Sequence, residues 1–124
     1  MNFLHNYQQQ AYALLRIVTG YMFIWHGTVK FFNYPMDYAY GPLNGLTTTA
    51  GAIEIIGGAL VMIGLWTRPA AFLCSGTMAV AYWMVHASNS PFPIVNHGEL
   101  AAFYCFAFLY IATRGAGIWS IDNR

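Results

Sequence analysis

The stretch AYALLRIVTGYMFIWHGTVKFF, residues 11–32, decides the fold that we predict for this chain. It is long enough to cross a bilayer, because about 20 apolar residues, each rising ~1.5 Å, cover the hydrocarbon core. Yet it contains Arg16, His26 and Lys30, which fall within a sector of roughly 80° when projected at about 100° per residue. Ionisable groups in a membrane are costly and face a bundle interior or a cavity. We therefore expect other helices to supply partners for this face.

The composition indicates an integral membrane protein. Charged residues make up 7% and hydrophobic residues 58%, whereas soluble domains have roughly 25% charged residues. A net charge of +1 excludes a protein that binds nucleic acid electrostatically. The 124 residues form at most one domain, read here as a single membrane domain over 1–124. The N-terminus lacks the basic segment and the cleavage site of a signal peptide, so the first span is expected to stay in place.

Three further apolar stretches complete an all-α bundle of four transmembrane helices with short loops. The predicted spans are residues 11–32, 46–66, 69–87 and 97–113. The loop at 33–45 is rich in Tyr, Pro and Gly, which is typical of a membrane–water interface. Along the second span Ala50, Gly57 and Gly64 repeat every seven residues, and such a stripe of small residues permits close helix contact.

The basic residues predict the orientation of these spans. Arg68, Arg114 and Arg124 share one side, and Arg16 lies nearer to that side, whereas the two longer loops contain no Lys or Arg. Cytoplasmic loops carry the excess of Lys and Arg. Both termini are therefore expected in the cytoplasm, with the chain crossing the membrane several times. In this orientation the three inner arginines, Arg16, Arg68 and Arg114, are interpreted as basic or structural anchors.

The remaining ionisable residues of the spans are predicted to converge in the outer half of the bundle. Lys30, His86 and Glu99 lie near outer helix ends, and His26 and Glu54 lie roughly 10 Å deeper. This cluster is the main candidate for a functional site. A carboxylate as deep as Glu54 needs a cation or a proton, which Lys30 or His26 can supply.

Simpler explanations compete at several of these positions. Lys30 can snorkel from its helix end, and Glu99 can close a capping box that starts at Asn96. His86, at a helix end, is better explained by the membrane interface than by catalysis. For Glu54 the alternatives are a functional role and an essential structural ion pair.

Metal, haem and thiol chemistry receive little support from the spacing. No His pair has the H-x-x-x-H spacing and no His and Glu the H-x-x-E spacing on one helix, so no metal or haem site is evident. Cys74 is expected near the inner side and Cys105 in the outer half, roughly 10 Å or more apart in depth. That separation argues against a disulfide-exchanging reductase. Tyr104 and Trp25 are candidates to wall a flat ring, with core packing or a lipid-facing belt as the alternative.

Four segments of the chain resemble the successive signatures of the DoxX family. They are RIVTGYMFIWHGTVKFF (16–32), EIIGGALVMIGLWTRPAA (54–71), NHGELAAFYCFAFLYIA (96–112) and GAGIWSID (115–122). They cover nearly all of the chain after about Leu14. The polar and tail residues that the resemblance carries over are Arg16, Lys30, Glu54, Arg68, Glu99, Gly115, Gly117, Ser120 and Asp122. His26 before Gly27 fits the common form of the first signature, whereas His97 stands where many members have glycine.

The resemblance implies the fold better than the chemistry. The family comprises small four-helix bacterial membrane proteins related to the DoxD subunit of thiosulfate:quinone oxidoreductase. Its members are linked to oxidation of sulfur compounds, to redox stress complexes and to quinone reduction. Together with the outer cluster, this leads to the hypothesis of a quinone-linked oxidoreductase, or its membrane subunit, acting on a small and conceivably sulfur-containing compound.

In this hypothesis the cofactor is a quinone, which needs an apolar pocket with a few groups that form hydrogen bonds and transfer protons. The candidate catalytic residues are His26, Glu54 and Lys30. The candidate residues for binding quinone or substrate are Lys30, His86, Glu99, Tyr104 and Trp25. Nothing in the chain supplies a site for a one-electron cofactor, so a redox partner subunit, or direct hydride or thiol chemistry, is required.

Two alternatives from other classes remain open. The chain is either a non-catalytic membrane anchor or assembly partner of a redox complex, with the cluster as a structural ion-pair network, or a carrier of a small solute or anion. A carrier of this size would need to form a homo-oligomer. In every case the lipid bilayer is a partner and nucleic acid is not.

Overall fold

The computed structural model describes residues 2–122, and every regular element in this part of the chain is helical. The elements are α1 (Asn2–His5), α2 (Gln8–Phe32), α3 (Gly45–Ile63), α4 (Thr67–Ala81), the π-helix η1 (Tyr82–His86), α5 (Pro93–Asn96) and α6 (Glu99–Arg114). The all-helical fold class predicted from the sequence is confirmed. Arg124, which was counted with the inner basic residues, lies outside the described residues.

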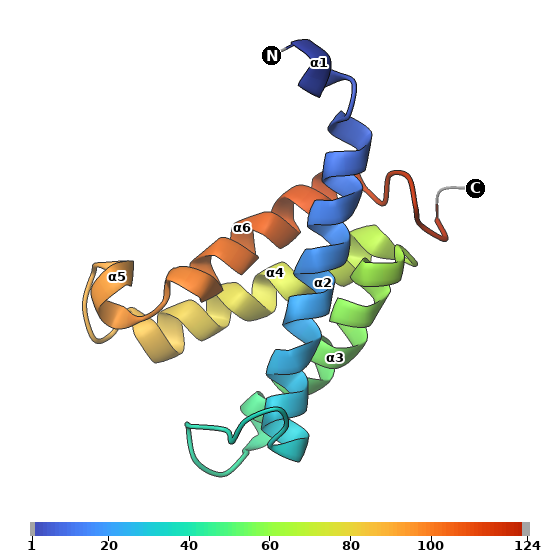
Figure 1. Cartoon of the computed structure of the whole chain (residues 1–124). Helices are drawn as coiled ribbons and strands as arrows, with labels where there is room; N and C mark the ends of the chain where they lie inside the picture. Colours follow the sequence, from blue (N-terminus) through green and yellow to red (C-terminus); the bar gives the residue numbers. More distant parts are fainter. Residues whose placement is uncertain (1, 123–124) are drawn as a thin grey trace.

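The long helices form two pairs, α2 with α3 and α4 with α6, and α3 also packs against α4. The pairs meet where α3 leads into α4 and α6 ends, and they diverge toward the 33–44 loop and toward α5 (Figure 1). Among the described helices, one is both long and apolar enough to cross a membrane, namely α3. Helices α4 and α6 have 15 and 16 residues, and α2 carries polar and charged side chains along its length. The bundle of four spans therefore stays a prediction.

The turn between α3 and α4 differs from the expected one. α3 ends at Ile63 rather than near Trp66, because Gly64 adopts φ 73° and both Gly64 and Leu65 donate backbone N–H bonds to the Leu60 carbonyl. This is the usual glycine-terminated helix end. α4 then begins at Thr67, so the proline expected at its first position, Pro69, is its third residue.

The start of α6 also corrects an expectation. The capping box from Asn96 to Glu99 does not form, because Asn96 Oδ1 accepts a hydrogen bond from the backbone N–H of Gly98 at 2.8 Å. His97 adopts the left-handed conformation with φ 63°, and α6 begins at Glu99 without a side-chain cap. Local backbone turning between α5 and α6 thus replaces the predicted cap.

Glycines allow α2 and α3 to pack closely. A Cβ at Gly20 would lie 2.6 Å from the carbonyl oxygen of Gly58, and a Cβ at Gly27 would lie 2.7 Å from that of Gly51. Gly20 and Gly27 are seven residues apart on α2, and Gly51 and Gly58 are seven residues apart on α3. This glycine seam between the two helices therefore runs along two helical turns. Backbones this close are typical of helix contacts in membrane proteins.

The stripe of small residues predicted on α3 is only partly a contact face. Gly57 faces α4, where a Cβ would lie 2.6 Å from Cys74 Sγ, and Gly64 terminates the helix. The seam to α2 is instead shifted by one residue, onto Gly51 and Gly58. Spacing identified a small-residue pattern but not which neighbour each residue meets.

A buried core joins the two pairs. Its residues are Tyr12, Phe23, Val61, Ala70, Ala71, Cys74, Met78, Tyr104, Phe108 and Ile111. The Phe23 ring from α2 lies 5.1 Å and 4.7 Å, between centroids, from the Tyr104 and Phe108 rings of α6. These aromatic contacts fix the crossing of α2 over α6.

The C-terminal tail after α6 is held by a buried arginine. Arg16, fully buried, donates hydrogen bonds to the carbonyl oxygens of Val61, Ala116, Ile118 and Trp119. The Tyr12 hydroxyl adds a 2.6 Å bond to the Gly115 carbonyl. Arg16 therefore connects α2, α3 and the tail inside the protein.

The glycine seam generates a first prediction. Gly20→Ala should lower the free energy of unfolding by about 1–3 kcal/mol, because the added methyl group meets rigid backbone rather than a movable side chain. The measurement is reversible unfolding in detergent.

Gly76→Ala is the matched control, since nothing lies within 4 Å of a Cβ there. It should be neutral or stabilising by up to about 1 kcal/mol, the helix preference of alanine over glycine. Equal stability changes in the two variants would contradict the close packing of α2 and α3.

Candidate functional site

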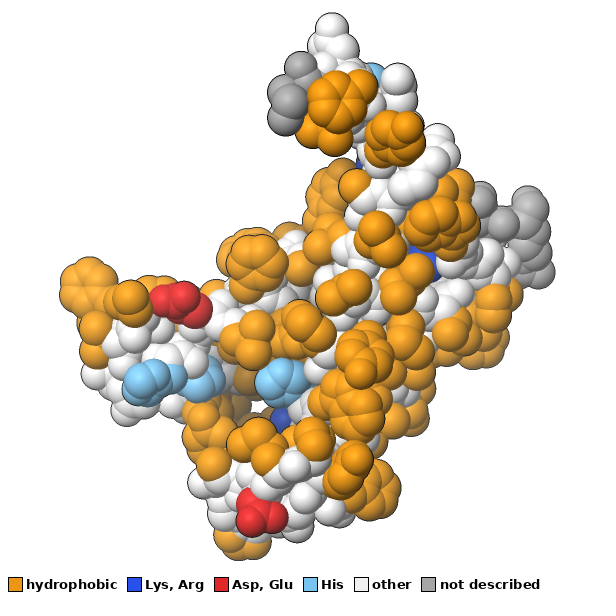
Figure 2. Space-filling model, viewed as in Figure 1, with side chains coloured by type: hydrophobic (Ala, Val, Ile, Leu, Met, Phe, Trp, Pro, Cys, Tyr) orange, Lys and Arg blue, Asp and Glu red, His pale blue; other side chains and the backbone are white. Residues whose placement is uncertain are grey.

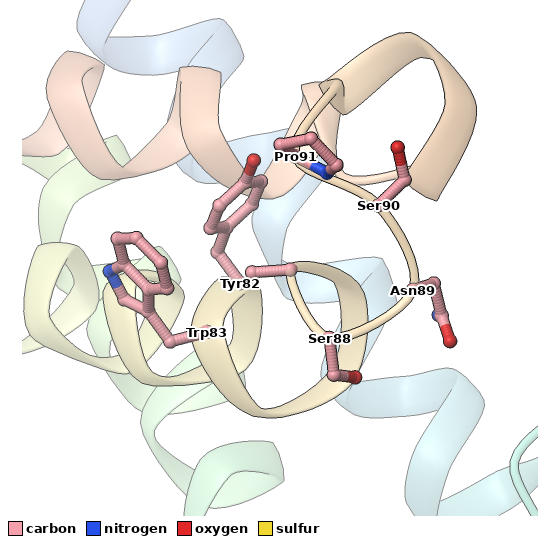
Figure 3. A pocket seen from close by; sticks show the side chains of 7 residues that line it. Tyr82, Trp83, Ser88, Asn89, Ser90 and Pro91 are labelled. Carbon is pink, nitrogen blue, oxygen red and sulfur yellow. The ribbon is translucent and has the colours of Figure 1, made fainter.

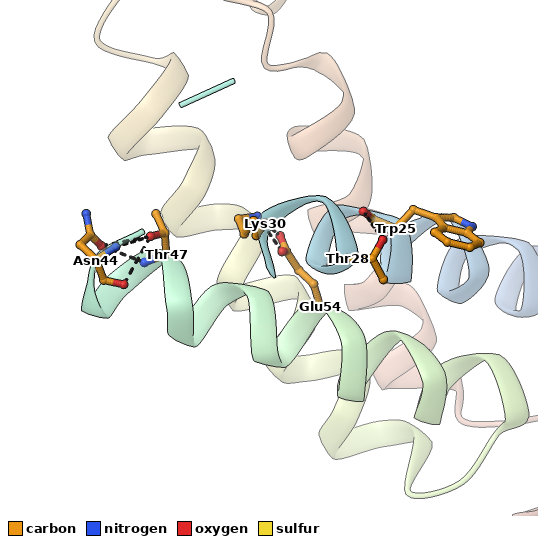
Figure 4. Close-up of polar contacts among 6 residues, drawn as sticks. All are labelled: Trp25, Thr28, Lys30, Asn44, Thr47 and Glu54. Carbon is orange, nitrogen blue, oxygen red and sulfur yellow. Dashed lines mark hydrogen bonds and ion pairs between the residues drawn. The ribbon is translucent and has the colours of Figure 1, made fainter. Parts of the chain in front are cut away.

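A buried ion pair joins α2 and α3. Lys30 Nζ donates to both carboxylate oxygens of Glu54, at 2.6 and 2.8 Å (Figure 4). The side chains of Lys30 and Glu54 are 14% and 1% exposed. Gly51 leaves room for the end of α2, because a Cβ there would lie 2.9 Å from the Phe31 ring and 3.4 Å from the Lys30 side chain. The partner predicted for Glu54 is thus Lys30.

Tyr38 covers this pair from the loop between α2 and α3. The Lys30 Nζ atom lies 5.8 Å from the centroid of the Tyr38 ring, within cation–π range. The backbone N–H of Tyr38 donates to Asn33 Oδ1 at 3.1 Å, which ties the loop to the end of α2. Burial raises the pKa of the Tyr38 hydroxyl, and the negative charge of Glu54 raises it further. The hydroxyl therefore stays protonated at neutral pH.

Tyr38 was missed as a site residue by the sequence analysis. The available signal was its place in a Tyr-rich loop that connects the helix of Lys30 to the helix of Glu54. Such a loop must fold back near the end of α2, but several tyrosines compete for the position. Only the path of the loop backbone determines which of these tyrosines lies over the ion pair.

His26 lies beside the pair rather than within it. Its ring stands edge-on to Tyr104 at 5.5 Å and lies 6.3 Å from Phe23, between centroids. No residue in the described part of the chain forms a hydrogen bond or ion pair with His26. The predicted network of three is therefore a pair with a neighbouring imidazole whose ring nitrogens are free to bind another group.

The two aromatic candidates have different positions. Tyr104 is 3% exposed and packs with Phe23 and Phe108 beneath His26. Trp25 contacts Tyr21 and Tyr34, at 6.0 and 6.2 Å between centroids, and lies apart from the ion pair (Figure 4). Tyr104 is thus placed to wall a site next to His26, whereas Trp25 faces another side of α2.

His86 and Glu99 do not join the ion pair, so the predicted convergence of five residues is wrong. His86 Nδ1 is 3.0 Å from the Asn96 carbonyl oxygen, and Glu99 is exposed at the first turn of α6. The reason is the divergence of the two helix pairs, which separates the η1–α5 end from the 33–44 loop (Figure 1). Depth along a helix does not determine distance across a splayed arrangement.

Two surface features accompany these residues. Figure 2 shows a hollow between the two helix pairs, with histidine and basic side chains at its edge. A separate pocket of about 430 Å³ lies at the end of η1 (Figure 3). It is lined by Tyr82, Trp83, Ala87, Ser88, Asn89, Ser90 and Pro91. That pocket contains none of the predicted site residues.

The inner arginines bind backbone carbonyls and an aromatic ring. Arg68 donates to the carbonyl oxygens of Ala112, Thr113 and Arg114, at 3.2, 2.5 and 3.2 Å, which caps the C-terminus of α6. The Arg114 guanidinium lies 4.5 Å above the Tyr12 ring. Both side chains lie at the end of the molecule opposite to the Lys30–Glu54 pair, near the tail.

The tail residues singled out by the family resemblance also have structural positions. Gly115 and Gly117 have φ of 91° and 71°, which glycine adopts without strain. Ser120 Oγ donates to the Gly117 carbonyl at 2.7 Å, and the Asp122 carboxylate accepts from the backbone N–H of Trp66 and Thr67. Asp122 thereby caps the N-terminus of α4.

The two cysteines are free and lie at a similar level, which corrects the depth expected for them. Ser75 Oγ donates to the Cys105 carbonyl at 2.7 Å, so Cys74, its neighbour in the chain, cannot be roughly 10 Å deeper than Cys105. They face different helices, because Cys74 meets Gly57 of α3 and Cys105 meets α4. Within residues 2–122, no group of three His, Cys, Asp or Glu side chains is placed to hold a metal ion.

The chain is similar in sequence to proteins from bacteria. An uncharacterized protein from Haemophilus influenzae is 46% identical over 132 residues, which cover 100% of this chain and 97% of the relative. A protein from Bacillus subtilis named "Putative oxidoreductase CatD" is 29% identical over 113 residues, covering 88% of this chain and 82% of the relative. No solved structure matches. Residues 11–87 match the DoxX family, and the chain therefore belongs to the DoxX family.

Proposed function

We propose that this DoxX protein crosses the bacterial inner membrane four times and acts as a quinone-linked oxidoreductase or as the membrane subunit of one. The observation that carries the proposal is the buried Lys30–Glu54 pair with the unbonded His26 beside it. A relative named as an oxidoreductase gives distant support for redox chemistry. The substrate is a small reduced compound, with sulfur compounds as the first candidates.

The surface supports four spans. Large hydrophobic side chains are exposed on each of the long helices, for example Leu14, Val18, Met22, Ile56, Phe72, Leu73, Val80, Phe103, Phe106 and Tyr110. Figure 2 shows hydrophobic side chains over most of the visible face. Apolar surface of this extent needs a cover, and for a family associated with membranes that cover is lipid.

The helix lengths are compatible with this placement. With η1 continuing α4, the third span reaches about 30 Å at ~1.5 Å per residue, whereas α6 reaches only about 24 Å. Local thinning of the bilayer accommodates such a short helix at modest cost. The bond from Tyr12 to Gly115 keeps the beginning of α2 and the tail at one end of the molecule, which supports placing both on the same side of the membrane.

The chemistry that we assign follows from the hydrogen-bond donor of Lys30 that Glu54 does not occupy. An ammonium has three N–H donors, and Lys30 directs two bonds to Glu54, which leaves a donor for a carbonyl oxygen. His26 exchanges the proton, and Glu54 keeps Lys30 charged and oriented. Lys30 and His26 would hold the quinone, whose reduction takes up two electrons and two protons. The electrons would come from the reduced substrate or from a partner subunit, and the two protons would pass through His26 one after the other, from that substrate or from water.

One observation favours a second function. Both oxygens of Glu54 are occupied by Lys30 and the carboxylate is almost fully buried, as in a purely structural ion pair. The protein would then be a membrane anchor or assembly partner of a redox complex. In the redox function the Lys30–Glu54 pair is needed for activity after the protein has folded. In the anchor function it is needed only for folding.

Replacing the lysine tests the quinone site. Lys30→Gln should weaken binding of a short-chain quinone by about ten-fold or more, because a charge-assisted hydrogen bond of roughly 1.5–3 kcal/mol is lost. Titration of the purified protein in detergent, followed by tryptophan fluorescence, measures the affinity. His97→Asn, an exposed position with a left-handed backbone that Asn tolerates, is the control and should bind as the wild type does.

A double-mutant cycle separates the two functions. Glu54→Gln and Lys30→Met should each destabilise by about 3–5 kcal/mol, because each leaves an uncompensated buried group, and the double variant should lose less than either. Strictly additive losses of thermal stability would show that the residues are uncoupled. A stable double variant that still supports quinone reduction would assign the pair to structure alone.

The thiols are expected to be silent in this chemistry. Cys74 and Cys105 are free and face different helices, so the double Cys→Ala variant should retain quinone-linked activity. Turnover in proteoliposomes measures this. A folded double variant without turnover would restore the thiol-exchange mechanism.

A further inference from the structure

A second cavity lies at the opposite end from Lys30 and Glu54, where α3 leads into α4 and the tail follows α6. It has a volume of about 400 Å³, within the range of about 300–1,000 Å³ typical of small-molecule sites. Trp66, Arg68, Arg114 and the backbone of residues 115–117 line it. The proposed quinone chemistry uses none of these residues.

Arg114 brings a guanidinium that is oriented but largely unbonded. It stacks over Tyr12 at 4.5 Å, and its one hydrogen bond to a described residue is a long one, 3.4 Å, to the Tyr110 hydroxyl. A guanidinium has five N–H donors. Most donors of Arg114 are therefore available to a ligand, and the aromatic ring limits the orientations of the side chain.

Arg68 adds a second positive charge to the same cavity. Its terminal nitrogens bind carbonyl oxygens of α6, and carbonyl groups leave the positive charge of the side chain in place. Neither Arg68 nor Arg114 forms an ion pair with a carboxylate of residues 2–122. Asp122, the acidic residue of the cavity, binds the backbone N–H groups at the start of α4.

We propose that this cavity binds the phosphate group of an anionic phospholipid. Guanidinium groups match phosphate oxygens with paired hydrogen bonds, and basic pockets between helices on the cytoplasmic side suit acidic lipid head groups. Trp66, 66% exposed at the rim, suits the membrane interface and offers apolar surface beside the phosphate. The choice of the cytoplasmic leaflet rests on the membrane placement of the proposed function and on the orientation predicted from the basic residues.

Lipid titrations test this site. Wild-type protein, freed of lipid in detergent, should bind phosphatidylglycerol at least about ten-fold more tightly than phosphatidylcholine in native mass spectrometry. Arg114→Gln should remove most of that preference, and Arg114→Lys should restore part of it, because lysine keeps the charge without the paired donors. Arg68→Lys should show a similar partial loss while the protein stays folded.

Three outcomes would overturn the proposal. They are equal affinity for the two lipids, an unchanged preference in Arg114→Gln, and binding of inorganic phosphate alone with the affinity of the lipid, which would make the cavity a site for free phosphate. Lys30→Gln is the control, and it should keep the lipid preference. Wild-type protein that prefers phosphatidylglycerol but binds no quinone would count against the redox function and leave this site standing.

Discussion

The pairing of one buried carboxylate controls the arrangement of α2, α3 and the loop between them. Glu54 is 1% exposed, and an ionised carboxylate in such surroundings needs a cation and hydrogen bonds. Lys30 meets this demand from the last turn of α2, but only because Gly27 and Gly51 let the two backbones approach. Tyr38 then covers the ammonium from the loop. The glycine seam, the ion pair and the loop together offset the free energy that burial of the Glu54 carboxylate costs.

At the other end of the molecule, backbone carbonyl groups stabilise a buried charge, that of Arg16. Arg16 is fully buried and, within residues 2–122, forms no ion pair with a carboxylate; it binds four backbone carbonyls instead. Arg68 caps the last carbonyls of α6, and Asp122 caps the first amides of α4. Each charge thus satisfies backbone groups that a helix end or an irregular tail leaves open. The tail is consequently a structural part of this DoxX protein, since it closes the junction of three helices.

Helical periodicity predicted which residues share a face, and that part of the site was correct in its geometry. It placed Arg16, His26 and Lys30 on one side of α2 and identified Lys30 as a partner available to Glu54. It failed where the answer depends on the angle between helices, since His86 at the end of η1 and Glu99 at the start of α6 belong to the helix pair that diverges from α2 and α3. It also failed for Tyr38, whose position depends on the path of a loop, and it did not identify the backbone carbonyls that Arg16 binds as a structural anchor, because no residue pattern encodes them.

The geometry of the ion pair bears on which ligand suits it. With both oxygens of Glu54 bound to Lys30 Nζ, the pair is neutral as a whole and exerts little attraction on a distant anion, so a carrier of free anions gains no support from it. A neutral ligand with a carbonyl oxygen fits better, because one short hydrogen bond from Lys30 does not require breaking the pair. His26, held edge-on by Tyr104 and without a hydrogen bond of its own among the described residues, is the group beside it that can move a proton. An apolar wall, a fixed donor and a free imidazole are the features on which the proposed quinone site depends.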